Sequence, residues 1–523
     1  MDEAIKREIG QHFVLGFHGD DVSEEVKTLI TQYYVGNIIL MKRNIRDAEQ
    51  VRRLTQNLQS LAKEAGHERP LMIGIDQENG LVSAFSSPTA GTQFPGAMAQ
   101  AAIGDLEVTR AIASGCGQEL KMVGINWAYS PVADVNINPL NPVIGVRSFG
   151  GDPQLVSDYA RAASQGFVSV NVASCGKHFP GHGDTQVDSH LALPVINKSR
   201  EEMDGGDLPP FRALIADKVP SVMTAHIALP RVTGNNEPAS LSRKMTTDVL
   251  RKELGYEGVI VTDCLEMAAI AAGPGIEEGA VRAIAAGADI AMICHTYGRQ
   301  VGAVERVWAA VEEGRVSIAE LKRSGERIAA MKERFAVETL EEEFGPRWAA
   351  LKERNERLSA EAYRKSAVVF KDEQKVLPLE LKGKMITLLT PLRGSINAAV
   401  DAEPTRNRGV PQDAEFARIV EKQCGTVKHI VYGPQDAVVD GGRADAVVIV
   451  TRNALRAGWQ WEVVKKTVRS LRGRVPVVAM ASCDPYELEL VDNELAQSRT
   501  AFVATHEFSV EGLLSGLGLS RGL

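Results

Sequence analysis

The sequence predicts an α/β protein with two parts: a (β/α)8 TIM barrel, followed by a smaller three-layer α/β domain. From residue 11 to about residue 313, apolar runs of strand length alternate with helical patterns, and eight such pairs can be counted. Eight βα units over about 300 residues are what this barrel requires. A doubly wound open sheet would show a glycine-rich phosphate turn after its first strand. The residues that follow Phe17 are HGDD, which form no such turn.

The bounds of the individual helices and strands are predicted from the spacing of apolar residues and from capping residues at the helix ends. Helices gain plausible starts at Asp152-Pro153 and at Ser199, which has Glu202 three residues later. The predicted strands are 12–17, 36–41, 71–76, 125–131, 173–179, 221–227, 258–263 and 289–295. The predicted helices are 22–34, 46–65, 105–122, 152–169, 200–217, 244–255, 277–287 and 299–313.

Polar or ionisable residues stand at or just beyond the ends of six of these eight apolar strands. They are Asp76, Asp134, Lys177 with His178, His226, Asp263 and His295. Reactive groups of a TIM barrel lie at the carboxyl ends of its strands, on one rim. The pattern therefore predicts a site at that rim.

The second half of the chain is organised differently. Residues 314–370 form a charged helical segment that suits a connector along the outside of the barrel. Strands are predicted at 385–390, 428–433, 446–451, 475–482 and 500–506, without a phosphate loop or a catalytic constellation. We place the domains at 1–335 (barrel), 336–370 (helical linker) and 371–523 (α/β sandwich). The irregular stretch 401–413 is long enough to be a loop that reaches the barrel rim.

Composition excludes several classes of protein. The chain has 59 basic and 67 acidic residues and a formal charge of −8, which argues against nucleic acid or an anionic membrane as partner. No window approaches the roughly 18 apolar residues that span a bilayer, and the start MDEAIKREIGQ has no apolar signal core. The six cysteines are scattered without zinc-type spacing. We expect a cytoplasmic enzyme with reduced thiols.

The stretch from Ser174 to Pro194 carries the densest chemistry, with three of the ten histidines. Histidine spacings of four and eight carry no metal signature, and no G-x-S-x-G elbow supports a serine nucleophile. General acid/base catalysis fits better, because Asp188 and His190 are two residues apart in the sequence, and their side chains lie on the same side of an extended backbone. His182 with Asp184 has the same spacing. A partner carboxylate is Asp263, as a nucleophile or as a helix N-cap.

These residues also carry a family resemblance. KHFPGHGDT (177–185) followed by DSH (188–190) resembles the signature of family 3 glycoside hydrolases, in the β-N-acetylglucosaminidase branch. The stretches IDQENG (75–80), GINWAYSPVADVN (124–136), IGVRSFG (144–150), MTAHI (223–227) and VTDCLEM (261–267) follow in the family's order. The resemblance covers roughly residues 10–335.

The resemblance implies a retaining exo-β-N-acetylglucosaminidase without metal or organic cofactor. Asp263 would be the nucleophile, and His190, held by Asp188, the acid/base, where most retaining glycosidases use a second carboxylic acid. The positions that bind the terminal sugar would be Asp76, Arg147, Lys177 and His178. Asp134 and His226 would support these groups. The expected partner is a small carbohydrate with terminal GlcNAc.

Two alternatives to hydrolysis stay open. One is a phosphorylase, since a neutral histidine repels an incoming phosphate less than a carboxylate does. The other is a sugar-binding barrel without turnover. The sequence also departs from the common bacterial pattern, which has arginines where this chain has Asn79-Gly80-Leu81 and Ser83-Ala84-Phe85. That departure favours a chitin-type oligosaccharide over an anionic peptidoglycan fragment.

Overall fold

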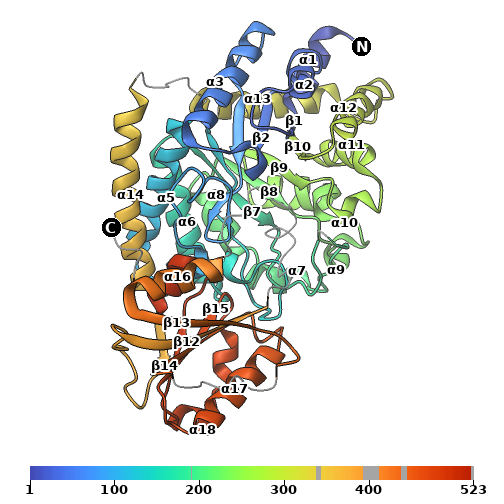
Figure 1. Ribbon diagram of the computed structural model, residues 1–523. Helices are drawn as coiled ribbons and strands as arrows, with labels where there is room; N and C mark the ends of the chain where they lie inside the picture. Colours follow the sequence, from blue (N-terminus) through green and yellow to red (C-terminus); the bar gives the residue numbers. More distant parts are fainter. Residues whose placement is uncertain (190, 337–342, 393–411, 437–443, 520–523) are drawn as a thin grey trace.

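The computed structural model describes residues 1–189, 191–336, 343–392, 412–436 and 444–519. Eight strands form a closed barrel in the order β1-β10-β9-β8-β7-β6-β3-β2, and all neighbouring strands are parallel. Each coincides with one of the predicted strands, so the predicted TIM barrel is confirmed (Figure 1). The barrel strands are β1 (Phe13–Leu15), β2 (Asn37–Leu40), β3 (Met72–Ile75), β6 (Trp127–Ala128), β7 (Ala173–Phe179), β8 (Ser221–Thr224), β9 (Val259–Cys264) and β10 (Ile290–Ile293).

Each of the eight predicted helices has a counterpart around the barrel that begins within two residues of the predicted start, whereas the first helix, α1, was not among them. Asp152 and Ser199 cap their helices as expected, and Ser199 with Glu202 forms a full capping box. The predicted helix 200–217 is split into two, because proline at positions 209 and 210 cannot continue a helix and instead starts a new one. The helices are α1 (Glu3–Gln11), α2 (Glu24–Thr31), α3 (Ala48–Glu64), α5 (Leu106–Met122), α6 (Pro153–Ser169), α7 (Arg200–Gly205), α8 (Pro209–Ala216), the π-helix η4 (Lys244–Glu253), α11 (Ile276–Ala286) and α12 (Tyr297–Glu312).

Short elements lie in the connections. The hairpin β4 (Gln77–Asn79) and β5 (Val82–Ser83) follows β3. Asn79, which ends β4, and Gly80, which begins the connection, both have positive φ, 71° and 61°, a conformation that Asn and Gly adopt most readily. The remaining short helices are η1 (Lys42–Asn44), α4 (Ala97–Ile103), η2 (Gly145–Arg147), α9 (Pro230–Thr233), η3 (Ala239–Leu241) and α10 (Ala268–Ala271).

The barrel interior is filled with side chains and closed at one end by α13 (Ile318–Phe335). Val14, Met72 and Trp127 belong to the apolar cluster inside the barrel. Ile328, Met331 and Phe335 of α13 join the same cluster. Since α13 packs at the amino-terminal end of the strands, the opposite rim is left for a ligand.

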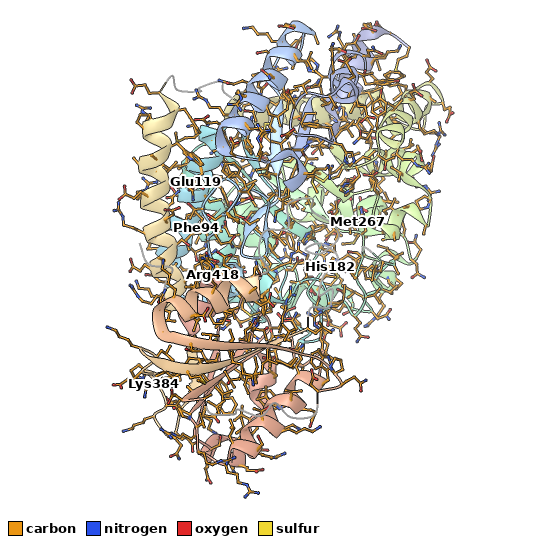
Figure 2. All side chains as sticks on the ribbon, in the orientation of Figure 1. Phe94, Glu119, His182, Met267, Lys384 and Arg418 are labelled. Atoms are coloured by element: carbon orange, nitrogen blue, oxygen red, sulfur yellow. The ribbon has the colours of Figure 1, made fainter. Side chains whose placement is uncertain are left out.

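The next helix, α14 (Phe344–Ser366), runs along the outside of the barrel toward the second sheet (Figure 1). It packs against α4, α5 and the C-terminal helix α19 (Val510–Gly516). Asn355 donates from Nδ2 to the Gly115 carbonyl at 3.0 Å and to Glu119 at 2.9 Å, and Figure 2 shows Glu119 beside this helix. The predicted connector therefore divides in two: α14 lies outside the barrel, whereas α13 forms its floor.

The C-terminal part is a six-stranded sheet in the order β11-β16-β15-β14-β12-β13. Five of its strands were predicted; the sixth, β11 (Val368–Lys371), is a short, largely exposed edge strand antiparallel to β16, and its apolar run falls inside the predicted linker. The other strands are β12 (Lys384–Pro391), β13 (Gly425–Tyr432), β14 (Ala446–Arg452), β15 (Val477–Ser482) and β16 (Thr500–Ala504). The domain boundaries 1–335, 336–370 and 371–523 remain a prediction.

Helices cover both faces of this sheet. Val448 and Met480 point into a cluster with Phe416 and Leu513. The alternate strand residues point to the opposite face, which α17 covers. This is the predicted three-layer arrangement. The helices are α16 (Gln412–Cys424), α17 (Trp459–Leu471), η5 (Tyr486–Leu490), α18 (Asn493–Gln497) and α19 (Val510–Gly516).

The second sheet domain docks on the end of the barrel that carries the strand termini. Asn136 donates from Nδ2 to the Tyr486 hydroxyl at 2.9 Å, and the amide of Gly96 donates to Glu507 at 3.0 Å. Most of the loop 401–413, proposed to reach this rim, lies outside the described residues. In the described part of the chain, no helix is both long and apolar enough to cross a membrane.

Candidate active site

The six polar strand ends predicted from the sequence lie on one rim of the barrel. Asp76 directly follows β3, His226 lies just beyond β8, and His295 just beyond β10. Lys177, His178 and Asp263 belong to β7 and β9. The segment that follows the short β6 continues alongside β7, because Val132 pairs in parallel with Lys177, and this brings Asp134 to the same rim. Since all barrel strands are parallel, their carboxyl ends meet on that side.

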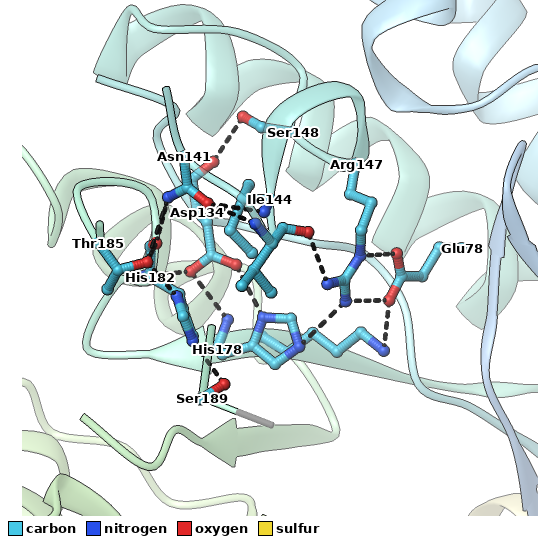
Figure 3. A network of polar contacts seen from close by, with 12 residues as sticks. Glu78, Asp134, Asn141, Ile144, Arg147, Ser148, His178, His182, Thr185 and Ser189 are labelled. Atoms are coloured by element: carbon cyan, nitrogen blue, oxygen red, sulfur yellow. Dashed lines mark hydrogen bonds and ion pairs between the residues drawn. The ribbon is translucent and has the colours of Figure 1, made fainter. Parts of the chain in front are cut away.

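Four side chains form an ion network at the rim, and Figure 3 shows the contact between two of them, Glu78 and Arg147. The Glu78 carboxylate accepts from Arg147 Nε and Nη2, both at 2.8 Å, and lies 2.7 Å from Lys177 Nζ. Lys177 Nζ also donates to Asp76 Oδ1 at 2.7 Å. The side chains of Glu78, Arg147 and Lys177 are buried, whereas that of Asp76 is 32% exposed. The network therefore opens to solvent at Asp76.

All members of the buried part of this network are charged. Burial opposes ionisation of Glu78, but the charges of Arg147 and Lys177 outweigh it and hold the pKa of that carboxyl far below its usual range. Burial also opposes the charge on Lys177, and Asp76 and Glu78 outweigh that effect and raise the pKa of the ammonium group. Fixed, preoriented charges of this kind make strong hydrogen bonds to hydroxyl and amide groups of a ligand.

Asp134 holds the loop that leaves β7. Its Oδ1 accepts from the backbone amides of His178 at 3.1 Å and His182 at 2.7 Å, and its Oδ2 accepts from His178 Nδ1 at 2.7 Å. The Nδ1 of His178 therefore carries a proton, while its Nε2 accepts from Arg147 Nη2 at 3.4 Å. Burial would raise the pKa of the Asp134 carboxyl, but His178 outweighs burial and the pKa is lowered. Asp134 thus supports His178, as the sequence predicts.

His182 fixes the next part of this loop. The Thr185 hydroxyl donates to the His182 carbonyl at 3.1 Å and accepts from His182 Nδ1 at 2.9 Å. The Nε2 of His182 is then the acceptor for the Ser189 hydroxyl at 2.9 Å. Burial lowers the pKa of His182 to about 4, so the ring is neutral at pH 7. Asp184 pairs with Lys198 at 3.1 Å and not with His182, so the competing His182/Asp184 pair is not formed.

Ser189 connects His182 to the residues predicted to be catalytic. It stands between Asp188 and His190, and both Asp188 and Ser189 are buried. The carbonyl of Asp188 accepts from the amides of Leu191 and Ala192 at 2.9 and 3.1 Å. His190 itself lies outside the described residues, so its distance from Asp263 remains a prediction.

Asp263 projects from the carboxyl end of β9 and is partly exposed. Its Oδ1 accepts from the amide of Cys264 at 2.7 Å. The helix α10 begins only at Ala268, with Met267 at its N-cap position, so Asp263 is not the N-cap of that helix. His226 donates from Nε2 to the Cys264 carbonyl at 2.9 Å and therefore braces the backbone beside Asp263.

The chain also matches known proteins. Residues 4–331 match the profile of the glycosyl hydrolase family 3 N terminal domain. This chain belongs to glycosyl hydrolase family 3. Beta-hexosaminidase A of Pseudoalteromonas piscicida is 32% identical over 460 residues, which are 81% of this chain and 75% of that protein.

Two solved family 3 structures resemble the whole chain. The β-N-acetylglucosaminidase from Paenibacillus sp. str. FPU-7 has a TM-score of 0.84 and 34% identity, over 98% of this chain and 96% of that chain. A fungal multi-domain family 3 β-N-acetylglucosaminidase has a TM-score of 0.88 and 34% identity, over 98% of this chain. The chain spans 59% of the length of that fungal protein.

Three residues of this family 3 site were not predicted individually. Glu78 stands in the quoted stretch IDQENG, where the Asn-Gly pair that follows is a strong turn signal. Asn141 donates from Nδ2 to the His182 carbonyl at 2.9 Å, and Ser189 holds the His182 ring. No local pattern marks Asn141 or Ser189, because their partners lie in a loop whose path depends on the folded barrel.

The departure from the family pattern at Leu81 has a structural reason. Leu81 and Val146 pack against the apolar cluster of the C-terminal domain. Leu81 is partly buried there, so a charged side chain at position 81 would have to be desolvated against that cluster. The hairpin therefore contacts the second domain in this chain.

Proposed function

We propose that the protein is an exo-acting β-N-acetylglucosaminidase that removes terminal, non-reducing GlcNAc by a retaining double displacement. The observation that carries the proposal is the polar cluster of Asp76, Lys177, Arg147 and His178 on the same rim as Asp263. The names of the relatives support the activity. Such a cluster suits one sugar ring with several hydroxyls and an acetamido group.

The proposed reaction has two displacements. Asp263 attacks the anomeric carbon, the bond from that carbon to the leaving oxygen breaks, and His190 protonates the leaving oxygen. Asp188 would hold one nitrogen of the imidazole and so increase its basicity. The neutral His190 then takes a proton from water, whose oxygen attacks the anomeric carbon and releases Asp263.

The hydrogen bonds of His182 with Thr185 and Ser189 support this assignment of roles. His182 has both ring nitrogens engaged by hydroxyl groups and is neutral, so it is poorly suited to proton transfer. It instead holds Ser189, between the two residues of the proposed dyad. We therefore assign proton transfer to His190 with Asp188, and positioning to His182.

A panel of aryl β-glycosides (GlcNAc, GalNAc, glucose and xylose) tests substrate class. We expect release from the GlcNAc derivative at the highest kcat/KM. Asp263→Asn should lose at least about 1000-fold in kcat while keeping substrate binding, since the nucleophile is absent. Trapping with a 2-deoxy-2-fluoro glycoside should place the sugar on the peptide that contains Asp263. An active Asp263→Asn variant, or label on another peptide, would contradict the mechanism.

Two further experiments test which molecule accepts the sugar, water or phosphate, and which aglycone is preferred. Product analysis with and without phosphate should give free GlcNAc in both cases, whereas sugar 1-phosphate would identify a phosphorylase. Chitobiose compared with a muropeptide tests the preference predicted from the Leu81 region. An acidic aglycone preferred over chitobiose would overturn that preference.

A further inference from the structure

Two thiols and an imidazole meet on the rim beside Asp263. Cys264 ends β9, and Cys294 and His295 follow the neighbouring strand β10. One ligand atom from each of the three lies within 4.8 Å of the other two. Among the described residues this is the one group of three or more metal-type ligands that approach so closely. Thiolate with imidazole is the ligand set preferred by Zn²⁺.

The group of Cys264, Cys294 and His295, which we term the thiol cluster, lies near two carboxylates that favour a cation, Asp76 and Glu266. The Arg43 guanidinium, which contacts Cys294 and His295, opposes a cation there. A hydrogen bond with Cys264 and burial raise the pKa of the Cys294 thiol, and the negative charges of Asp76 and Glu266 act in the same direction. The same carboxylates attract a positive ion. Cys264 and His295 are partly exposed, so an ion can enter from the rim.

The backbone of the thiol cluster is held in place before any ion binds. The Glu266 carboxylate accepts from three successive amides, those of Cys294 at 2.9 Å, His295 at 2.6 Å and Thr296 at 2.9 Å. Arg43 Nη1 donates to His295 Nδ1 at 3.1 Å, so that nitrogen is unprotonated. Zn²⁺ would replace this donor at Nδ1, because a neutral imidazole binds a metal through its unprotonated nitrogen.

We propose that Cys264, Cys294 and His295 bind Zn²⁺ and that the bound ion inhibits the enzyme. Binding replaces the two thiol protons, which are released to solvent, and a water molecule completes four-coordination. The ion would be attached to the residue whose amide donates to Asp263 Oδ1 at 2.7 Å. It would draw charge from the nucleophile and so lower kcat. The inhibition, unlike the binding, rests on the proposed glycosidase activity.

Binding is tested directly, without any turnover. Co²⁺ is titrated into the reduced full-length protein, with a phosphine reductant present, and thiolate-to-cobalt charge-transfer absorption is recorded. Zn²⁺ affinity follows from competition with a chromophoric chelator. We expect one equivalent and a charge-transfer band in the wild type. Cys424→Ser serves as the matched control, because Cys424 is a buried thiol of the C-terminal domain.

Cys294→Ser and His295→Gln are each expected to weaken Zn²⁺ binding more than about 100-fold, since even partners outside the ligand sphere contribute 10- to 100-fold. Cys264→Ser, at a partly exposed position, provides a third variant in case Cys294→Ser does not fold. Unchanged Zn²⁺ affinity in the folded variants, or a cobalt spectrum without a thiolate band, overturns the site.

The same variants separate the site from the activity. Zn²⁺ should lower kcat of the wild type and of Cys424→Ser at concentrations that leave Cys294→Ser fully active. Equal inhibition of Cys294→Ser would place the inhibitory ion elsewhere and overturn the inference. A wild type that shows the cobalt band but does not cleave any aryl glycoside would support the site and refute the proposed function instead.

Discussion

Replacing Glu78 with glutamine tests whether the rim is held together by buried charges. Two carboxylates, Glu78 and Asp76, balance two cations, Arg147 and Lys177. Lys177 keeps Asp76 after the change, but Arg147 loses its bidentate partner and the network keeps one cation in excess. Breaking one partner out of a buried ion pair costs about 3–5 kcal/mol.

We therefore expect Glu78→Gln to lower the free energy of unfolding of the barrel by about 3–5 kcal/mol. We also expect kcat/KM to fall about 100-fold. Without its carboxylate partner the Arg147 guanidinium can shift, and a displacement of about 1 Å can cost that much. Urea unfolding followed by tryptophan fluorescence measures the first effect, and hydrolysis of aryl β-GlcNAc measures the second.

An exposed ion pair gives the matched control. Glu353 on α14 lies 2.8 Å from Arg357, and both side chains are more than half exposed. Glu353→Gln should change stability by no more than about 0.5 kcal/mol. If Glu78→Gln unfolds at the same urea concentration as Glu353→Gln and keeps wild-type kcat/KM, the reasoning about the network is refuted.

Three further predictions concern the loop and the docked domain. Ser189→Ala removes the donor to buried His182 Nε2, so we expect the free energy of unfolding to fall by about 1–3 kcal/mol. Amide hydrogen exchange across 182–189 should become faster, and unchanged exchange would show that this hydrogen bond does not hold the loop. Burial raises the pKa of Asp484 to about 6, so the folded state keeps a proton that the unfolded chain releases near pH 4. The free energy of unfolding should fall by up to about 3 kcal/mol as the pH rises from about 4 to about 6. Asp484→Asn should remove this slope, and an identical slope in the variant would contradict the assignment. Leu81→Arg should loosen the docked domain and increase its proteolysis, whereas Leu140→Arg, at a surface leucine that is 51% exposed, should not; equal proteolysis of both would disprove the contact.

The barrel was predictable because each strand is a short apolar run set between amphipathic helices. The positions of Asp76 and Lys177 could be predicted for the same reason, since parallel strands place their carboxyl ends together. The approach of Glu78 to Arg147 could not, because 69 residues separate them and the contact depends on the loop after β6. Local patterns carry no information on such a distance.

Two features of the fold depended on tertiary contacts in the same way. The amphipathic pattern of α13 predicts a helix but not that its apolar face closes the barrel floor. The edge strand β11 is short and half exposed, and it exists because it pairs with β16, more than 130 residues later. In both cases the partner, and not the local sequence, decides the role.

The position of α13 has a consequence for synthesis of the chain. The floor of the barrel is supplied by residues that come after the eighth βα unit, so the first 313 residues leave the apolar interior open to water. During translation, the strands can pair once β10 has emerged, but the floor is complete only once Phe335 has left the ribosome. A nascent chain arrested before that point should bind chaperones that recognise exposed apolar surface, and one arrested beyond α13 should release them.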